Sequence, residues 1–138
     1  MDDKLVGLIM KHEGLRLFPY KCTAGKLTIG IGRNIQDRGI SRDEAMYLLN
    51  NDIQLSIREL SHYDWFLKLD EVRQGALIEL HFNIGLAKLL KFKNMISFIE
   101  SGYYANASTQ LLKSLWASQV GENRSKDMAY RLKNGKYQ

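Results

Sequence analysis

Three side chains near the N-terminus, Glu13, Cys22 and Thr28, are the residues of this sequence best suited to chemistry. They offer a carboxyl, a thiol and a hydroxyl within one short stretch of chain. A protonated glutamic acid can deliver a proton to the leaving oxygen of a glycosidic bond, while a water or a nucleophile reaches the sugar carbon from elsewhere. Cys22 and Thr28 are the candidates for this second task, so the set is compatible with glycoside hydrolysis.

A histidine beside this set suggests a different chemistry, in which His12 would activate Cys22 as the nucleophile of a thiol hydrolase. The helical spacing argues against it, because His12 continues an apolar stripe and is expected to be packed or partly buried. That stripe consists of Leu5, Leu8 and Ile9. His62 and His81 are most simply interpreted as surface or core residues.

Metal and cofactor sites have no support in the sequence. The three histidines are scattered, there is one cysteine, and no acidic calcium-binding loop is present. Gly30-Ile31-Gly32 lacks both the third glycine of a dinucleotide fingerprint and the lysine of a phosphate-binding loop. We therefore expect neither a metal nor a cofactor.

The elements that position the three candidates can be read from local patterns. Residues 3–13 have helical spacing and Gly14 stands where a cap would end the helix, so Glu13 falls on the last turn. Ala24-Gly25 predicts a turn, and residues 26–32 alternate like a strand that forms half of a hairpin.

The alternation in this strand predicts two different faces. Leu27, Ile29 and Ile31 would share a packed face, and the opposite face would be nearly bare because it carries only small residues. Those residues are Thr28, Gly30 and Gly32. The bare face is a candidate floor for a substrate cleft, with Gly30 touching substrate; alternatively, the glycines only make bends.

The rest of the chain is helical in character. Ser41 and Glu44 form a capping box that begins a long helix ending at about residue 61, an aromatic break follows at 63–66, and residues 69–83 are helical again. Gly85 separates them from shorter helical stretches. The predicted class is α+β and mostly helical, in one domain. This domain would consist of a small β-containing lobe at about 15–40, a connecting helix at about 41–61, and a helical lobe at about 64–138 that includes the N-terminal helix.

The composition limits the partners. A net charge of +5 and a pI near 9.3 favour an anionic partner, which could be nucleic acid, a membrane surface or a carboxylate-bearing bacterial wall. Basic residues are interspersed with acidic ones and no zinc or RNA-binding signature is present, so nucleic acid is disfavoured. The single cysteine and the absence of a signal-like or bilayer-spanning segment predict a protein held in a cytoplasm, without a stable membrane anchor. We also expect a monomer.

The segment from His12 to Gly32, HEGLRLFPYKCTAGKLTIGIG, resembles the active-site region of the phage-type lysozymes, the endolysins of glycoside hydrolase family 24. That family places Glu, then Asp or sometimes Cys, then Thr at these spacings. It also keeps a Glu-Gly pair, a tyrosine before the second residue and a Thr-x-Gly-x-Gly strand. A weaker resemblance extends over nearly the whole chain, through the capped helix, residues 76–85, Trp116 and Asn123-Arg124.

The resemblance implies a two-lobed lysozyme fold and hydrolysis of the β-1,4 bond between N-acetylmuramic acid and N-acetylglucosamine in peptidoglycan glycan strands. Glu13 would be the general acid, Cys22 would stand where a carboxylate often polarises the attacking water, and Thr28 would help to hold that water. It further implies two residues that touch sugar, Phe82 and Gln110. Such an endolysin would accumulate in the host cytoplasm and lyse the cell once a separate membrane lesion releases it to the wall.

Charged residues around the acid are carried over from the same resemblance. Arg124 would be the charge partner of Glu13. Arg33 replaces a histidine that often follows the second glycine in the family, and arginine does not titrate in the working range. If Arg33 points at Glu13 it favours the charged form of that acid, which burial would oppose.

The cysteine leaves three roles open. Cys22 could orient water as a thiol or thiolate, attack the sugar to give a thioglycosyl enzyme, or mark an inactive descendant. We favour the first role, because Glu13 and Thr28 are kept around it.

Two other functions compete with hydrolysis. The main alternative is an inactive wall-binding or structural module with a lysozyme fold. A basic membrane-disrupting protein is suggested by cations near the C-terminus, but Glu122 and Asp127 interrupt them and favour a solvated surface. These cations are Lys113, Arg124, Lys126, Arg131, Lys133 and Lys136.

Overall fold

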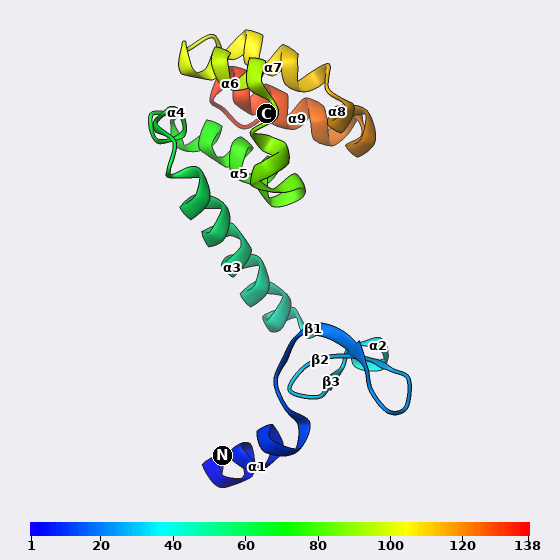
Figure 1. Cartoon of the computed structure of the whole chain (residues 1–138). Helices are drawn as coiled ribbons and strands as arrows, with labels where there is room; N and C mark the ends of the chain where they lie inside the picture. Colours follow the sequence, from blue (N-terminus) through cyan, green and yellow to red (C-terminus); the bar gives the residue numbers. More distant parts are fainter. The chain divides into compact units, whose positions relative to one another are not determined.

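The computed structural model describes residues 1–138 and contains nine helices and one three-stranded antiparallel sheet (Figure 1). This composition confirms the predicted class, α+β and mostly helical. The chain forms two compact units, Met1–Leu48 and Leu49–Gln138, with the boundary inside helix α3. Each unit is described by itself below.

The first helix, α1 (Asp3–Glu13), has the predicted ends. The Asp2 carboxylate accepts a hydrogen bond of 2.9 Å from the N–H of Lys4, and Gly14 ends the helix with φ = 75°. Glu13 is therefore its last residue, as expected. No residue of α1 is buried and His12 is exposed, so the expectation of a packed histidine is wrong here, because nothing in the N-terminal unit covers that face.

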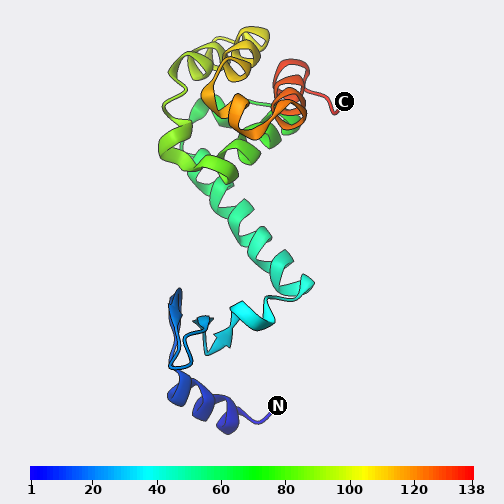
Figure 2. The ribbon, with the colours of Figure 1, turned by 90° about the vertical axis from the view of Figure 1, so that its right-hand side faces the viewer.

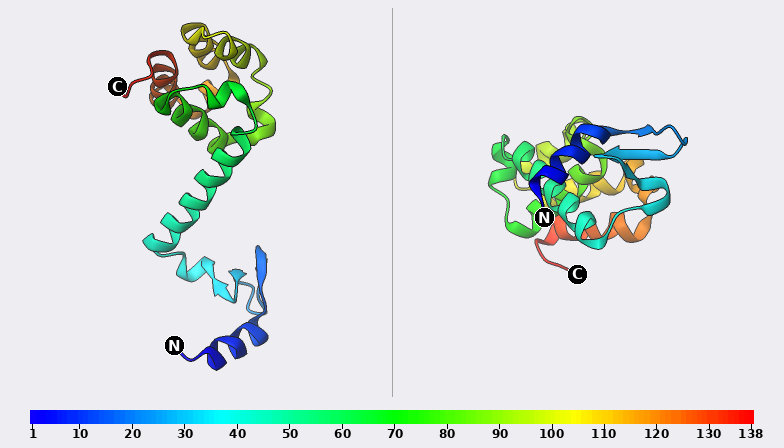
Figure 3. Two further views of the ribbon diagram at one scale, coloured as in Figure 1. Left: turned by 90° about the vertical axis from the view of Figure 1, so that its left-hand side faces the viewer. Right: turned by 90° about the horizontal axis from the view of Figure 1, so that it is seen from below.

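The sheet consists of β1 (Arg16–Lys21), β2 (Leu27–Gly30) and β3 (Arg33–Asn34), in that spatial order. Figure 3 shows β1 and β2 side by side as the predicted hairpin, in which Tyr20 lies opposite Thr28. The register of β1 is irregular between Arg16 and Tyr20, where Pro19 lies. Proline has no N–H for a ladder bond, and an edge strand tolerates this.

The expected strand over residues 26–32 is shorter than predicted. It ends at Gly30, and both Gly30 and Gly32 have φ = 73°, so the chain turns there into β3. The expected faces are wrong as well, since Thr28 is 3% exposed whereas Leu27 and Ile31 are 38% and 39% exposed. The positive φ angles interrupt the two-residue period, so these glycines do make bends.

Two helices follow the sheet, the short α2 (Ile35–Arg38) and the long α3 (Arg42–Leu60). The predicted capping box is present at the start of α3, where the Ser41 hydroxyl accepts from the N–H of Glu44 at 3.1 Å. In return, the Glu44 carboxylate accepts from the N–H of Ser41 at 2.9 Å. Helix α2 is tied to β2, because the Gln36 side-chain oxygen accepts from the N–H of Leu27 at 3.0 Å.

The C-terminal unit is entirely helical and holds the buried core. Its helices after α3 are α4 (Asp64–Leu67), α5 (Glu71–Leu89), α6 (Lys93–Glu100), α7 (Tyr104–Leu112), α8 (Leu115–Val120) and α9 (Glu122–Asn134). Helix α5 is broken at Gly85, where φ is 80°, as the sequence predicts. Helix α7 packs on α6 and α9, and α5 packs on α9 (Figures 1 and 2).

The core of this unit is built from large apolar side chains on all these helices. Its largest fully buried side chains are those of Leu60, Phe66, Leu77, Leu80, Leu89, Met95, Leu111, Met128 and Leu132. None of the helices combines the length and the apolar content needed to cross a membrane.

Candidate active site

The Glu13 side chain lies directly against the turn that connects β2 and β3. A Cβ atom placed on Gly32 would stand only 2.6 Å from Oε2 of Glu13 and 2.8 Å from its carboxyl carbon. A side chain at position 32 would force the carboxyl to move, and the φ of 73° is also one that residues other than glycine rarely adopt. Gly32 therefore makes a close approach possible as well as a bend, and the end of α1 meets the sheet through it.

The hairpin of β1 and β2 brings Cys22 and Thr28 together. The turn between the strands closes through the N–H of Gly25, which donates to the Cys22 carbonyl at 2.8 Å, and the N–H of Cys22, which donates to the Lys26 carbonyl at 2.9 Å. This confirms the predicted turn. Thr28 is buried on β2 and its hydroxyl donates to the Lys26 carbonyl at 2.9 Å.

Hydrogen-bond donors around the Cys22 sulfur favour its charged form. The backbone N–H of Lys26 lowers the pKa of the thiol most, followed by that of Ala24; the Thr28 hydroxyl adds to the effect and desolvation opposes it. The Thr28 hydroxyl has one proton, so it can serve either the Lys26 carbonyl or a thiolate at one time. Cys22 is partly exposed and thus reachable by solvent.

We expect Cys22 to react with iodoacetamide at a lower pH than an ordinary cysteine, because the thiolate is the reacting species. The rate of alkylation against pH should have its midpoint below that of the denatured protein measured in the same buffers. Thr28→Val, which removes one donor, should raise this midpoint. Equal midpoints in the folded and denatured protein would contradict the assigned environment.

The remaining predicted residues of the N-terminal unit, Gly30 and Arg33, line one hollow of about 520 Å³ together with Leu15 and Gly32. Arg33 does not need Glu13 as a charge partner, because both ends of its guanidinium bind the Glu44 carboxylate, at 3.0 and 2.8 Å. The hydrogen bonds from Arg33 are the largest cause that lowers the pKa of Glu44 to about 2.

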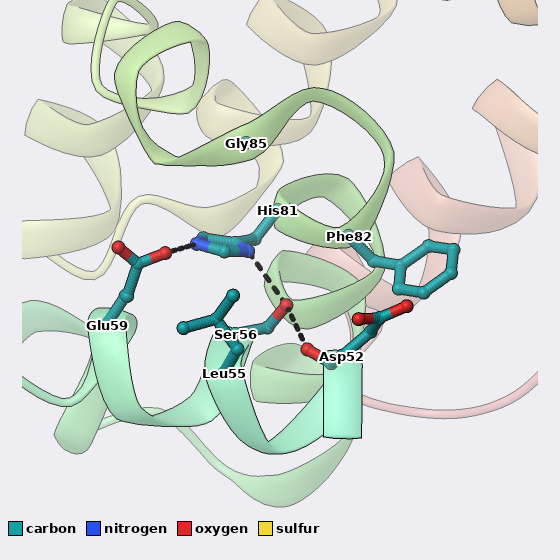
Figure 4. A pocket seen from close by; sticks show the side chains of 7 residues that line it. All are labelled: Asp52, Leu55, Ser56, Glu59, His81, Phe82 and Gly85. Carbon is teal, nitrogen blue, oxygen red and sulfur yellow. Dashed lines mark hydrogen bonds and ion pairs between the residues drawn. The ribbon is translucent and has the colours of Figure 1, made fainter. Parts of the chain in front are cut away.

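In the C-terminal unit, Phe82 lines a hollow of about 360 Å³ between α3 and α5 (Figure 4). It is 46% exposed, so it is not a core aromatic. The wall of this hollow also carries carboxylates, a hydroxyl and an imidazole. The lining residues are Asp52, Leu55, Ser56, Glu59, His81, Phe82 and Gly85.

A chain of hydrogen bonds crosses this hollow from helix to helix. His81 Nε2 donates to the Glu59 carboxylate at 2.9 Å, and His81 Nδ1 lies 2.7 Å from the Ser56 hydroxyl (Figure 4). The order hydroxyl, imidazole, carboxylate is one that activates serine in hydrolases. The Ser56 hydroxyl donates to the Asp52 carbonyl at 3.1 Å rather than to the imidazole, so the serine is not activated and these bonds join α3 to α5.

Gln110 does not share the hollow of Phe82. It lies on α7 and lines a separate hollow of about 230 Å³ whose wall includes three lysines, Lys91, Lys93 and Lys113. None of these lysines has an ion-pair partner. The two predicted sugar-contacting residues thus line different hollows of the C-terminal unit.

Arg124 lies in the first turn of α9 and binds Glu79 of α5 at 3.2 Å. Glu79 also accepts from Arg131, which is 7% exposed, at 2.6 Å, and Arg131 contacts Asp127 at 3.0 Å. Much of the basic C-terminal cluster is therefore paired with acids inside its own unit. The pairing of Arg124 with Glu13 stays a prediction.

Sequence reasoning missed Glu44 as a partner of Arg33 and missed the bonds among Ser56, Glu59 and His81. Ser56 and Glu59 are three residues apart on α3, a spacing that places them on one face. Nothing local indicates that His81, on another helix, meets both of them. The capping box identified Glu44 as a residue with a structural role. That motif predicts only its bond to Ser41 and not its contact with Arg33.

The chain is similar in sequence to known proteins. The model of the phage lysozyme family matches residues 10–133 of the chain. The chain is 31% identical over 117 residues to an endolysin of Acyrthosiphon pisum secondary endosymbiont phage 1, which covers 82% of this chain and 78% of that protein. It is 26% identical over 150 residues to probable T4-type lysozyme 2 of Dictyostelium discoideum, covering 87% and 88% of the two chains.

A second Dictyostelium discoideum protein, probable T4-type lysozyme 1, is 25% identical over 155 residues and covers 91% of each chain. The family match includes Glu13, the hairpin with Cys22 and Thr28, and nearly the whole helical unit. The chain therefore belongs to the phage lysozyme family.

Proposed function

We propose that this protein is an endolysin that hydrolyses the β-1,4 bond between N-acetylmuramic acid and N-acetylglucosamine in peptidoglycan. Glu13 is the general acid, and Cys22 and Thr28 orient the attacking water. The observation that carries this proposal is the Glu13 carboxyl lying against the Gly32 turn, in the same unit as the hairpin that carries Cys22 and Thr28. Membership of the phage lysozyme family supports it.

The chemistry requires Glu13 to hold its proton until the glycosidic oxygen arrives. Proton transfer to that oxygen makes it a leaving group, and the sugar carbon then accepts the oxygen of water. The proton lost by the water passes to a basic group or to solvent. The Glu13 carboxyl lies against the Gly32 backbone, and correct placement of the acid is itself a large part of catalysis.

Cys22 takes the water-orienting place that a carboxylate fills in much of the family. Backbone N–H groups that lower the pKa of its thiol increase the thiolate fraction near neutral pH. A thiolate can accept a hydrogen bond from water as a carboxylate does. The Thr28 hydroxyl stands beside the sulfur as the second water ligand.

In this proposal, two residues of the C-terminal unit bind the glycan. Phe82 offers an exposed aromatic face to a sugar ring, and Gln110 offers an amide at the margin of its own hollow. The enzyme acts as a monomer on glycan strands. It accumulates in the host cytoplasm and reaches the wall after a separate membrane lesion, so its action is host-cell lysis.

The proposal is tested by the chemistry of the product. Purified peptidoglycan is digested with the wild-type protein, the new chain ends are reduced with borohydride, and the reduced sugar is identified by mass spectrometry. We expect reduced N-acetylmuramic acid. Reduced N-acetylglucosamine or new amino groups would show that another bond is cut, and tight binding without new ends would identify an inactive wall-binding module.

A further inference from the structure

We propose that Glu44 is a positioning residue that acts through Arg33 to hold the Gly32 backbone where the Glu13 carboxyl rests. The inference rests on the proposed function, in which Glu13 is the general acid. It gives a role to two residues outside the set of groups that touch substrate. It also gives a reason for an arginine at position 33.

Two parallel hydrogen bonds join the side chains of Arg33 and Glu44. Arg33 Nη1 and Nη2 donate to the two oxygens of Glu44 at 3.0 and 2.8 Å, in the forked geometry that fixes both direction and distance. Arg33 Nη1 also donates to the Gly39 carbonyl at 3.2 Å, and Glu44 further accepts from the N–H of Ser41. The end of the sheet is thus tied to the start of α3 at several points.

The side chains of this pair are 28% and 42% exposed, and exposed ion pairs add little to stability. The main effect of the pair is therefore on geometry. Strand β3 has only two residues, paired with Ile29 and Thr28, so its own ladder is a weak anchor. The bond to Glu44 supplies the anchor that the ladder lacks.

Gly32 immediately precedes Arg33, so movement of the Arg33 backbone moves Gly32 as well. The Glu13 carboxyl contacts Gly32 on that side, since its oxygen occupies the space that a Cβ would take. A shift of about 1 Å at the reacting groups costs up to about 100-fold in rate. Loosening Glu44 should therefore act on the acid without any contact between the two carboxyls.

The pair remains ionised over the working range. The Arg33 hydrogen bonds hold the pKa of Glu44 at about 2, and Glu44 in turn raises the pKa of Arg33 above its usual value. Glu44 thus compensates the charge of Arg33, which does not have to be balanced by the acid Glu13.

The test is Glu44→Gln against Asp43→Asn, the neighbouring exposed carboxylate, which has no hydrogen-bond or ion-pair partner among the side chains. Both variants lose one negative charge in the first turn of α3. Rates on purified peptidoglycan are measured well below the melting temperature. We expect kcat of Glu44→Gln to fall by about tenfold or more with KM within about twofold, and Asp43→Asn to match the wild type.

If Glu44→Gln does not fold, the positioning role is tested with Arg33→Lys instead. The exposed Arg42→Lys is the control for this variant. Lysine keeps the charge but cannot form the fork, so the same fall in kcat is expected. A kcat equal to that of the control, in either folded variant, would overturn the inference.

A second readout separates this inference from the proposed function. The amide resonance of Gly32 should shift, and its hydrogen exchange should become faster, in Glu44→Gln but not in Asp43→Asn, whether or not Glu13 is catalytic. Full activity of Glu13→Gln would defeat the proposed function alone. An unchanged Gly32 amide in Glu44→Gln would defeat the positioning role alone.

Discussion

Glu13→Gln is expected to lower the rate of peptidoglycan cleavage by about 1,000-fold, because glutamine cannot donate a proton to the leaving oxygen. The substitution keeps the size and shape of the side chain, so its contact with Gly32 and the fold should persist. Release of soluble fragments from purified peptidoglycan measures the rate, and circular dichroism measures the fold. Binding to the insoluble wall should remain, since the loss concerns a step after binding.

Asp3→Asn is the matched control for this substitution. Asp3 lies on the same helix, is exposed and also loses one negative charge when replaced. Its rate should stay within about twofold of the wild type, as is usual for a surface change away from special features. A Glu13→Gln enzyme as fast as Asp3→Asn would remove Glu13 from the reaction.

Gly32→Ala is expected to have the second largest effect on activity, a fall of about tenfold to 100-fold. The added methyl group would stand 2.6 Å from the Glu13 carboxylate oxygen, so the carboxyl must move. Alanine at φ = 73° also costs about 1–2 kcal/mol of stability. Activity at saturating substrate and the free energy of unfolding in urea measure the two effects separately.

Gly102→Ala separates backbone strain from the clash. Gly102 has φ = 78°, close to that of Gly32, but a Cβ there has nothing within 4 Å. It should therefore lose a similar amount of stability and keep its activity. If Gly32→Ala were no less active than Gly102→Ala, the contact with Glu13 would have no catalytic importance.

Much of the fold follows from local signals in the sequence. Gly14 ends α1, Ser41 and Glu44 begin α3, and Gly85 breaks α5, each through a backbone requirement that a few neighbouring residues express. The position of Glu13 at a helix end was predictable for the same reason. The turn at Ala24-Gly25, which places Cys22 near Thr28, is also local.

The faces of the β2 segment could not be predicted in this way. An alternating pattern predicts two faces only while the backbone stays extended, and Gly30 and Gly32 leave that region. Ile31 consequently lies in a turn. Thr28 precedes both glycines, and the pattern does not indicate that its side of β2 is the covered one. A glycine at such positions has two possible meanings, bend or close approach, and Gly32 turns out to have both.

Contacts between residues far apart in the sequence could not be predicted from local patterns either. Trp116 Nε1 donates to Asn83 Oδ1 at 2.7 Å and joins α8 to α5, and both residues stand in segments that resemble the family. The resemblance indicated that these segments matter but not that they touch. The same holds for His81, whose partners Ser56 and Glu59 are fixed only when α3 and α5 pack.

The roles of Glu13 and Cys22 can be tested together by measuring, side by side, the clearing of purified peptidoglycan by wild type, Glu13→Gln and Cys22→Asp. We expect clearing by the wild type and none above background by Glu13→Gln. Cys22→Asp should clear at least as fast as the wild type, because a carboxylate can orient the same water. Clearing by Glu13→Gln at the wild-type rate would contradict these roles, and so would a folded but inactive Cys22→Asp protein, which would assign the sulfur a role that oxygen cannot fill.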